Sequence, residues 1–69
     1  MIHIKCRLKV LRAEADMTQE DLAKAIGVAR QTVVSIENGA YVPSLLLGLQ
    51  LAQYFKKPVE EVFVIERKE

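Results

Sequence analysis

The feature that most constrains this chain is the spacing of the helix-start and helix-stop signals in its middle. Thr18 stands three residues before Asp21, which is the arrangement of a capping box, where a hydroxyl accepts from a free backbone N–H and an acid reaches back. Gly27 can end that helix in the left-handed conformation, and Asn38 followed by Gly39 is a common terminating pair. The pattern predicts two short helices joined by a tight turn.

Along each of these two helices, apolar residues recur three or four positions apart and therefore lie on one face, which turns inward. They are Leu22, Ala23 and Ile26 in the first helix and Val33 and Ile36 in the second, which spans about Arg30 to Asn38. Ala23 is small at the position where the two helices would approach most closely. Two short helices that cross closely through a tight turn form a helix-turn-helix, about residues 18–38.

Further helices are expected on both sides of this pair. On the N-terminal side, Ile4, Leu8, Leu11 and Ala15 recur at spacings of four, three and four, which predicts a helix running to about Ala15. On the C-terminal side, Pro43 and Ser44 open a helix whose core face holds Leu45, Gly48, Leu51, Ala52 and Phe55. Pro58 suits the first turn of a short last helix, Val59 to Phe63.

The two ends of the chain differ from its helical middle. Ile2 and Ile4 alternate with His3 and Lys5, and residues 63–65 are a β-favouring run. Either the ends form a small strand pair, or both are unpaired tails. The fold class is therefore all-α: one domain over residues 1–69, five helices, with or without the terminal strand pair.

A chain of 69 residues has room for only a thin core, and domains this small usually need a disulfide, a metal or a partner chain. Cys6 is the single cysteine, and with His3 it makes no four-ligand zinc set, so we expect no disulfide and no metal. No apolar run approaches the roughly 20 residues that span a bilayer, and no signal-peptide pattern is present. We expect a cytoplasmic protein without membrane contact.

The runs Thr18–Ala23, Gly27–Val28, Arg30–Val33 and Ile36–Gly39 resemble the phage-repressor, or Xre-type, regulators. The likeness extends from about residue 8 to residue 63, and it is closest to the minimal members that are little more than a DNA-binding domain. It implies a transcriptional regulator, acting as a repressor, whose partners are double-stranded operator DNA and a second copy of the chain. It implies no cofactor and no small-molecule ligand.

The resemblance also implies roles for single residues. The second helix of the motif would enter the major groove, with base contacts from Arg30, Gln31, Thr32 and Ser35. Each good bidentate base contact is worth about 1–3 kcal/mol. The residues that would contact backbone phosphates are Thr18, Gln19, Asn38 and Tyr41. Periodicity alone would interpret the same groups as a solvated helix face.

Arg12 and Glu37 match positions that form a partly buried ion pair in similar repressors. Two departures from the family pattern weaken the DNA contacts. Ala29 stands where a capping Ser is common, and Ala40 stands where a basic residue is common. Together with a net charge of only +1, they predict moderate affinity for DNA and a modest salt dependence.

Leu46, Leu47 and Tyr54 lie outside the expected core stripe of their helix. Either a second copy of the chain covers these residues, or the last helix and the tail cover them. Because similar regulators bind palindromic operators, we expect a two-fold homodimer with recognition helices about 34 Å apart.

Catalysis is not expected, because the acids are scattered, no nucleophile stands beside a base, and the glycines form no phosphate-binding loop. The alternative function is a protein-binding module on the same scaffold, such as an antitoxin or a cofactor. The near-neutral charge and the surplus leucines favour that alternative. Salt dependence distinguishes the two, since only DNA binding releases counterions.

Overall fold

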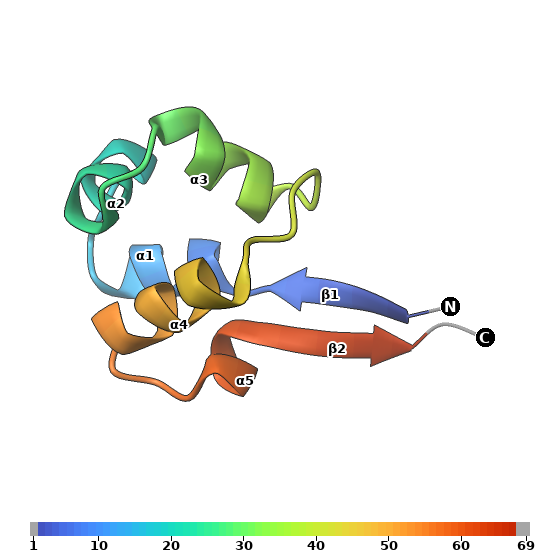
Figure 1. Cartoon of the computed structure of the whole chain (residues 1–69). Coiled ribbons are helices and arrows are strands. Elements are labelled where there is room, and N and C mark those ends of the chain that lie inside the picture. The colour runs from blue at the N-terminus through green and yellow to red at the C-terminus, as the bar shows by residue number, and fades with distance from the viewer. Residues whose placement is uncertain (1, 68–69) are drawn as a thin grey trace.

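Short helices form the body of the protein, and its two ends meet in a strand pair. The structure is a computed structural model that describes residues 2–67. In chain order the elements are β1 (Ile2–Cys6), α1 (Leu8–Glu14), α2 (Gln19–Ile26), α3 (Arg30–Glu37), α4 (Leu45–Tyr54), α5 (Val59–Val62) and β2 (Phe63–Arg67). Helices α2 and α3 lie together on one side of α1 and α4, and α5 lies on the opposite side (Figure 1).

The start of α2 has the predicted capping box. The Thr18 hydroxyl accepts from the backbone N–H of Asp21 at 3.0 Å, and the Asp21 carboxylate accepts from the backbone N–H of Thr18 at 3.0 Å. The helix ends at Gly27, whose φ of +88° is the left-handed conformation that glycine adopts without a Cβ penalty. The capping box at one end and Gly27 at the other set the length of α2, and Gly27 also sets the angle at which the chain enters α3.

The core is built from apolar side chains of all five helices. Its buried members are Leu8, Leu11, Leu22, Ala23, Val33, Ile36, Leu51, Ala52 and Val62. All the inward-facing residues predicted for α2 and α3 either belong to this core or, in the case of Ile26, pack against it. Because α3 is fastened to the core by one face, its other face is left for a ligand.

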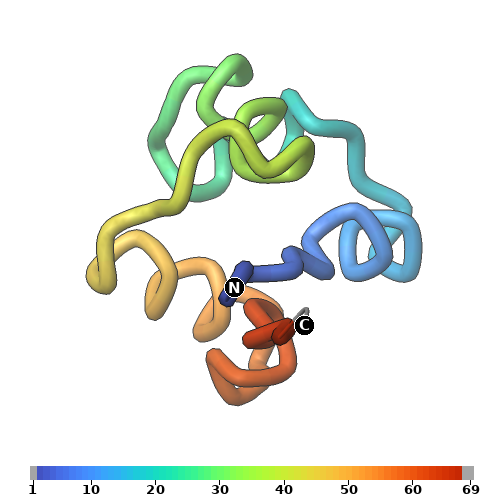
Figure 2. Tube along the Cα trace, turned by 90° about the vertical axis from the view of Figure 1, so that its right-hand side faces the viewer, coloured from blue at the N-terminus to red at the C-terminus, as the bar shows by residue number. Residues whose placement is uncertain are grey.

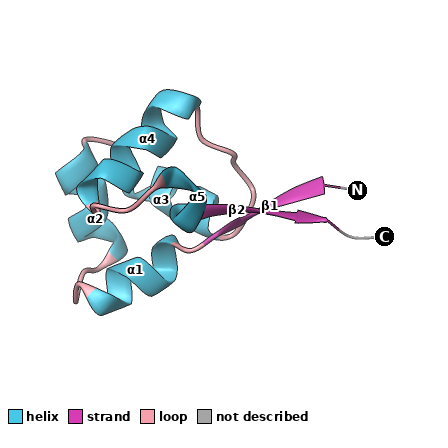
Figure 3. Ribbon diagram, turned by 90° about the horizontal axis from the view of Figure 1, so that it is seen from below, coloured by secondary structure: helices cyan, strands magenta, loops and turns pink. Residues whose placement is uncertain are grey.

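The two ends of the chain form an antiparallel strand pair, as one of the two sequence interpretations predicted. The register pairs Ile2 with Arg67 and Cys6 with Phe63. The backbone N–H of Arg7 donates to the Val62 carbonyl at 2.8 Å, which ties the ribbon to the helices. Figure 2 shows the two ends side by side, and Figure 3 shows the strands extending together away from the helices. The alternative of unpaired tails is wrong for these residues.

Three details of the predicted helices are wrong. Ile4 belongs to β1 and is 45% exposed, and Ala15 is exposed just after α1 ends at Glu14, so neither lies on a core face of α1. Leu45 is 74% exposed, because it is the first residue of α4, where the helix has not yet reached the core. Phe63 begins β2 instead of ending α5.

Among residues 2–67, no helix combines the length and the apolar character needed to cross a membrane.

Candidate nucleic-acid interface

Helix α3 carries the four residues predicted to contact bases on the side away from the core. Arg30 and Gln31 are exposed, and Thr32 and Ser35 are half-buried. The helix begins after Ala29, whose extended backbone is that of an N-cap but whose side chain has no acceptor atom. The two most accessible of the four side chains therefore stand at the uncapped start of the helix.

Tyr41 lies beside three of the residues predicted to contact bases. Gln31, Thr32, Ser35 and Tyr41 line one hollow on the surface. The Ser35 carbonyl accepts from the backbone N–H groups of Ala40 and Tyr41 at 2.9 and 3.1 Å, which folds the loop back against α3. The Ser35 hydroxyl accepts from the Gln31 amide at 3.4 Å. Ser35 thus holds both Tyr41 and Gln31 in position.

Sequence reasoning missed Val34, a half-buried residue of α3. It follows Arg30 by four residues and precedes Asn38 by four, which puts it on the same helix face as both. The same periodicity could have found it. Val34 lines a surface hollow together with Gln19 and Asn38, two of the residues predicted to contact phosphates.

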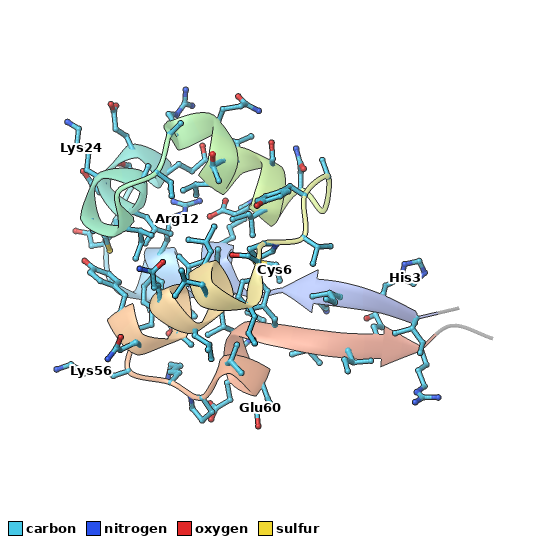
Figure 4. The ribbon with its side chains drawn as sticks, viewed as in Figure 1. His3, Cys6, Arg12, Lys24, Lys56 and Glu60 are labelled. Atoms are coloured by element: carbon cyan, nitrogen blue, oxygen red, sulfur yellow. The ribbon has the colours of Figure 1, made fainter. Side chains whose placement is uncertain are left out.

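Arg12 and Glu37 form the expected ion pair between α1 and α3. Arg12 Nε lies 2.6 Å from Glu37 Oε2, and Arg12 Nη2 lies 3.0 Å from Glu37 Oε1. A third guanidinium nitrogen donates to the Met17 carbonyl at 2.9 Å. The side chains are only 14% and 6% exposed. Figure 4 shows Arg12 in the space between α1 and the α2–α3 pair, where it joins the motif to the rest of the fold.

Gln19 belongs to the same network. Its amide nitrogen donates to Glu37 Oε1 at 3.1 Å, so Glu37 is linked to α1 and to α2. Burial by itself would raise the pKa of Glu37, but hydrogen bonds from Arg12 and Gln19 and the positive charges of Arg12 and Lys9 outweigh it. The pKa of Glu37 is therefore lowered, and the carboxylate is charged.

Two other predicted phosphate contacts have part of their hydrogen-bonding capacity in use. The Thr18 hydroxyl accepts from the backbone N–H of Asp21, and its O–H can still donate. The Asn38 side-chain oxygen accepts from the backbone N–H of Ala40 at 3.0 Å. The Asn38 amide group remains able to donate at the exposed C-terminal end of α3.

The apolar surface of α4 differs from the predicted one. Leu46 is 69% exposed, as expected for a residue outside the core stripe. Leu47 is half-buried and packs against the core, so its assignment to surplus surface is wrong. Tyr54, at the other end of the helix, donates its hydroxyl to Met17 Sδ at 3.7 Å and stacks edge-on against Phe55.

The close pair α2–α3, the left-handed turn at Gly27 and the free outer face of α3 define a helix-turn-helix protein. The profile of a helix-turn-helix family matches residues 8–62. The chain is 47% identical over 66 residues, 96% of its length, to all of an uncharacterised HTH-type transcriptional regulator of Methanocaldococcus jannaschii. It is 46% identical over 94% of its length to 98% of the uncharacterised HTH-type transcriptional regulator YgzD of Bacillus subtilis.

A more distant relative is the cryptic phage CTXphi transcriptional repressor RstR of Vibrio cholerae, 34% identical over 81% of this chain and half of that protein. The crystal structure of the transcriptional regulator VanUg superposes with a TM-score of 0.80, covering 97% of this chain and 89% of that one. At 19% identity, that likeness shows the fold alone. The chain belongs to the Xre-type helix-turn-helix family of transcriptional regulators.

Proposed function

We propose that this regulator binds double-stranded operator DNA as a homodimer, reads the major groove with α3 and represses transcription. The observation that carries the proposal is the exposure of Arg30 and Gln31 at the N-terminal end of α3, on the side away from its core face. The N-terminal residues of a recognition helix are the ones that contact base edges. The phage relative RstR is a transcriptional repressor, which supports repression as the sign of regulation.

Arg30 and Gln31 carry most of the base readout. A guanidinium donates two hydrogen bonds to guanine, and a carboxamide pairs with the adenine edge, each contact being worth about 1–3 kcal/mol. Thr32 and Ser35 contribute less direct readout, because both are half-buried. Thr18, Gln19, Asn38 and Tyr41 orient the domain on the DNA, with Thr18, Gln19 and Asn38 as donors to phosphates.

The homodimer forms through an exposed apolar surface, the α4 patch, defined as Val42, Leu45, Leu46 and Leu49. Their exposed fractions are 61%, 74%, 69% and 46%. Apolar patches of this kind mark partner sites in soluble proteins, and a two-fold interface uses the same patch on both subunits. Tyr54 lies at the opposite end of α4 and is bound to Met17, so the interface does not depend on it.

The test is selection from a random duplex library at two salt concentrations, with the wild type, the double variant Arg30→Ala, Gln31→Ala, and the control Lys57→Ala. We expect the wild type and the control to enrich a palindrome. The double variant should lose enrichment and keep weak nonspecific binding, because phosphate contacts carry no sequence information. Enrichment of the same palindrome by the double variant would contradict readout by α3.

The second candidate is a protein-binding module on the same scaffold. A net charge of +1 and the exposed leucines of the α4 patch favour it. The same experiment separates the two functions. DNA binding must weaken with salt because bound counterions are released, whereas a module that binds only proteins would enrich no duplex at either salt concentration.

A further inference from the structure

Helices α1, α2 and α3 together enclose a surface cleft that sequence reasoning did not identify. Its volume is about 310 Å³. The lining residues are Lys9 and Arg12 from α1, Gln19 from α2, Val34 and Glu37 from α3, and Asn38. We call it the three-helix cleft. It holds two of the expected phosphate contacts, Gln19 and Asn38, together with a lysine from outside the helix-turn-helix pair.

The charged side chains of the cleft are two cations and one carboxylate, so the cleft is net positive. Two guanidinium nitrogens of Arg12, Nε and Nη2, donate to the Glu37 carboxylate, so the charges of this pair nearly cancel. Lys9 is exposed and close enough for its charge to lower the pKa of Glu37. The positive charge that no carboxylate of the cleft neutralises is therefore that of Lys9, whose side chain is exposed to solvent.

The uncharged polar groups of the cleft retain donors. The amide nitrogen of Gln19 has two hydrogens, and Glu37 accepts one of them. The side-chain oxygen of Asn38 is used by the backbone N–H of Ala40, which leaves the amide hydrogens of Asn38 free to donate outward. An ammonium group and two amide donors around one hollow match an anion with several acceptor oxygens. A backbone phosphate of DNA has that chemistry.

We propose that the three-helix cleft binds one backbone phosphate of the operator and that Lys9 supplies its cation. This inference rests on the proposed function, and it adds a DNA-contacting residue from α1. Glu37 acts as a positioning residue in the cleft, since its hydrogen bond fixes the plane of the Gln19 amide. The contact also compensates for Ala40, which brings no charge to the same end of α3.

The experiment compares Lys9→Gln with Lys56→Gln. Lys56 is exposed and lies on the opposite side of the molecule from α3 (Figure 4), so its variant removes the same charge away from the cleft. A third variant, Lys9→Arg, keeps the charge. Affinity for the selected duplex and for a random-sequence duplex is measured over a series of salt concentrations, and melting temperatures are recorded for every variant.

We expect Lys9→Gln to reduce the slope of log affinity against log salt by about 1.8, the value for two phosphate contacts on duplex DNA, because each protomer of the bound homodimer loses one contact. Between 50 and 200 mM salt, the wild type should then lose about 12-fold more affinity than the variant. The reduction should be equal on both duplexes, because a phosphate contact is independent of sequence. Lys56→Gln and Lys9→Arg should keep the wild-type slope.

Equal slopes for the wild type and Lys9→Gln would overturn the role of the cleft and leave the proposed function intact. An equal reduction in Lys56→Gln would also overturn it, because the effect would then be one of net charge. A wild type whose affinity for DNA does not change with salt would overturn both the cleft and the proposed function.

Discussion

Among single residues, Glu37 does the most to connect the motif with the rest of the protein. Its carboxylate accepts from Arg12 of α1 and from Gln19 of α2 while its backbone belongs to α3. Three helices that already share the apolar core are thereby also joined at one charged centre. The arrangement also links stability to pH, because the pKa of Glu37 is lowered in the folded protein.

Protonation of Glu37 should destabilise the fold at acid pH. A folded-state pKa below the ordinary value of 4.5 means that the stabilisation is complete above about pH 4.5. It is lost as pH falls through the lower, folded-state pKa. Urea denaturation at a series of pH values from 7 to 3 should show this loss in the wild type.

The matched variant for this prediction is Glu37→Gln, which leaves the Arg12 guanidinium without a counter-charge. We expect it to be less stable at pH 7 by about 3 kcal/mol, as for a buried pair that has lost one partner. It should also lose less stability on acidification. A residual loss in both proteins is expected from Asp21, whose pKa is lowered by its capping hydrogen bonds with Thr18. Parallel pH curves for the two proteins would refute this role of Glu37.

Among the secondary-structure elements, α2 and α3 differ in how they begin. Helix α2 has a complete capping box, whereas α3 is preceded by Ala29, which has the N-cap backbone and no side-chain acceptor. The first turn of α3 is consequently the less stable one. That turn contains the two residues assigned to base readout, Arg30 and Gln31.

Replacing Ala29 by Ser should stabilise the protein by about 1 kcal/mol, because the hydroxyl can accept from a free N–H of the first turn. The reverse change at the other helix, Thr18→Ala, should destabilise it by about the same amount. Both changes are measured as free energies of unfolding by chemical denaturation, and the slope of that free energy against denaturant concentration should stay at its wild-type value. An Ala29→Ser variant no more stable than the wild type would mean that the first turn of α3 gains nothing from a cap.

At the scale of the whole molecule, 69 residues support only a thin core, yet the α4 patch leaves large apolar side chains in water. A second copy that covers the patch would bury them and add stability that depends on protein concentration. The patch and α3 belong to the same small domain, so the proposed dimer would also set the spacing of its two α3 helices.

Light scattering at micromolar concentration should give twice the chain mass of 7.8 kDa. The double variant Leu45→Gln, Leu49→Gln should be monomeric and bind the palindrome more weakly. The control is Val10→Gln on α1, because Val10 is as exposed as Leu49, at 46%, and lies outside the patch. A wild-type monomer, or a dimer unaffected by the double variant, would contradict the proposed interface.

Much of the fold could be predicted from the sequence, because its signals are local. The Thr18–Asp21 box, the left-handed turn at Gly27 and the inward residues of α2 and α3 depend on neighbours within one or two turns. The strand pair could not be decided in this way, since β1 and β2 stand at opposite ends of the chain and only the packed helices bring them together. The same reason explains the error at Ile4, whose spacing fits a helix but whose partner is Ile65.

The outward face of α3 also follows from periodicity, and the motif residues point to the family, so the sequence by itself determined both the family and the residues on the outward face of α3. Only the tertiary structure decided how residues far apart in the chain meet. It joined Gln19 to Glu37, brought Tyr41 beside Ser35, and put Lys9 in the same cleft as Gln19 and Asn38. A periodic pattern specifies which side of a helix faces inward, whereas the neighbours on its other side depend on how separate helices pack.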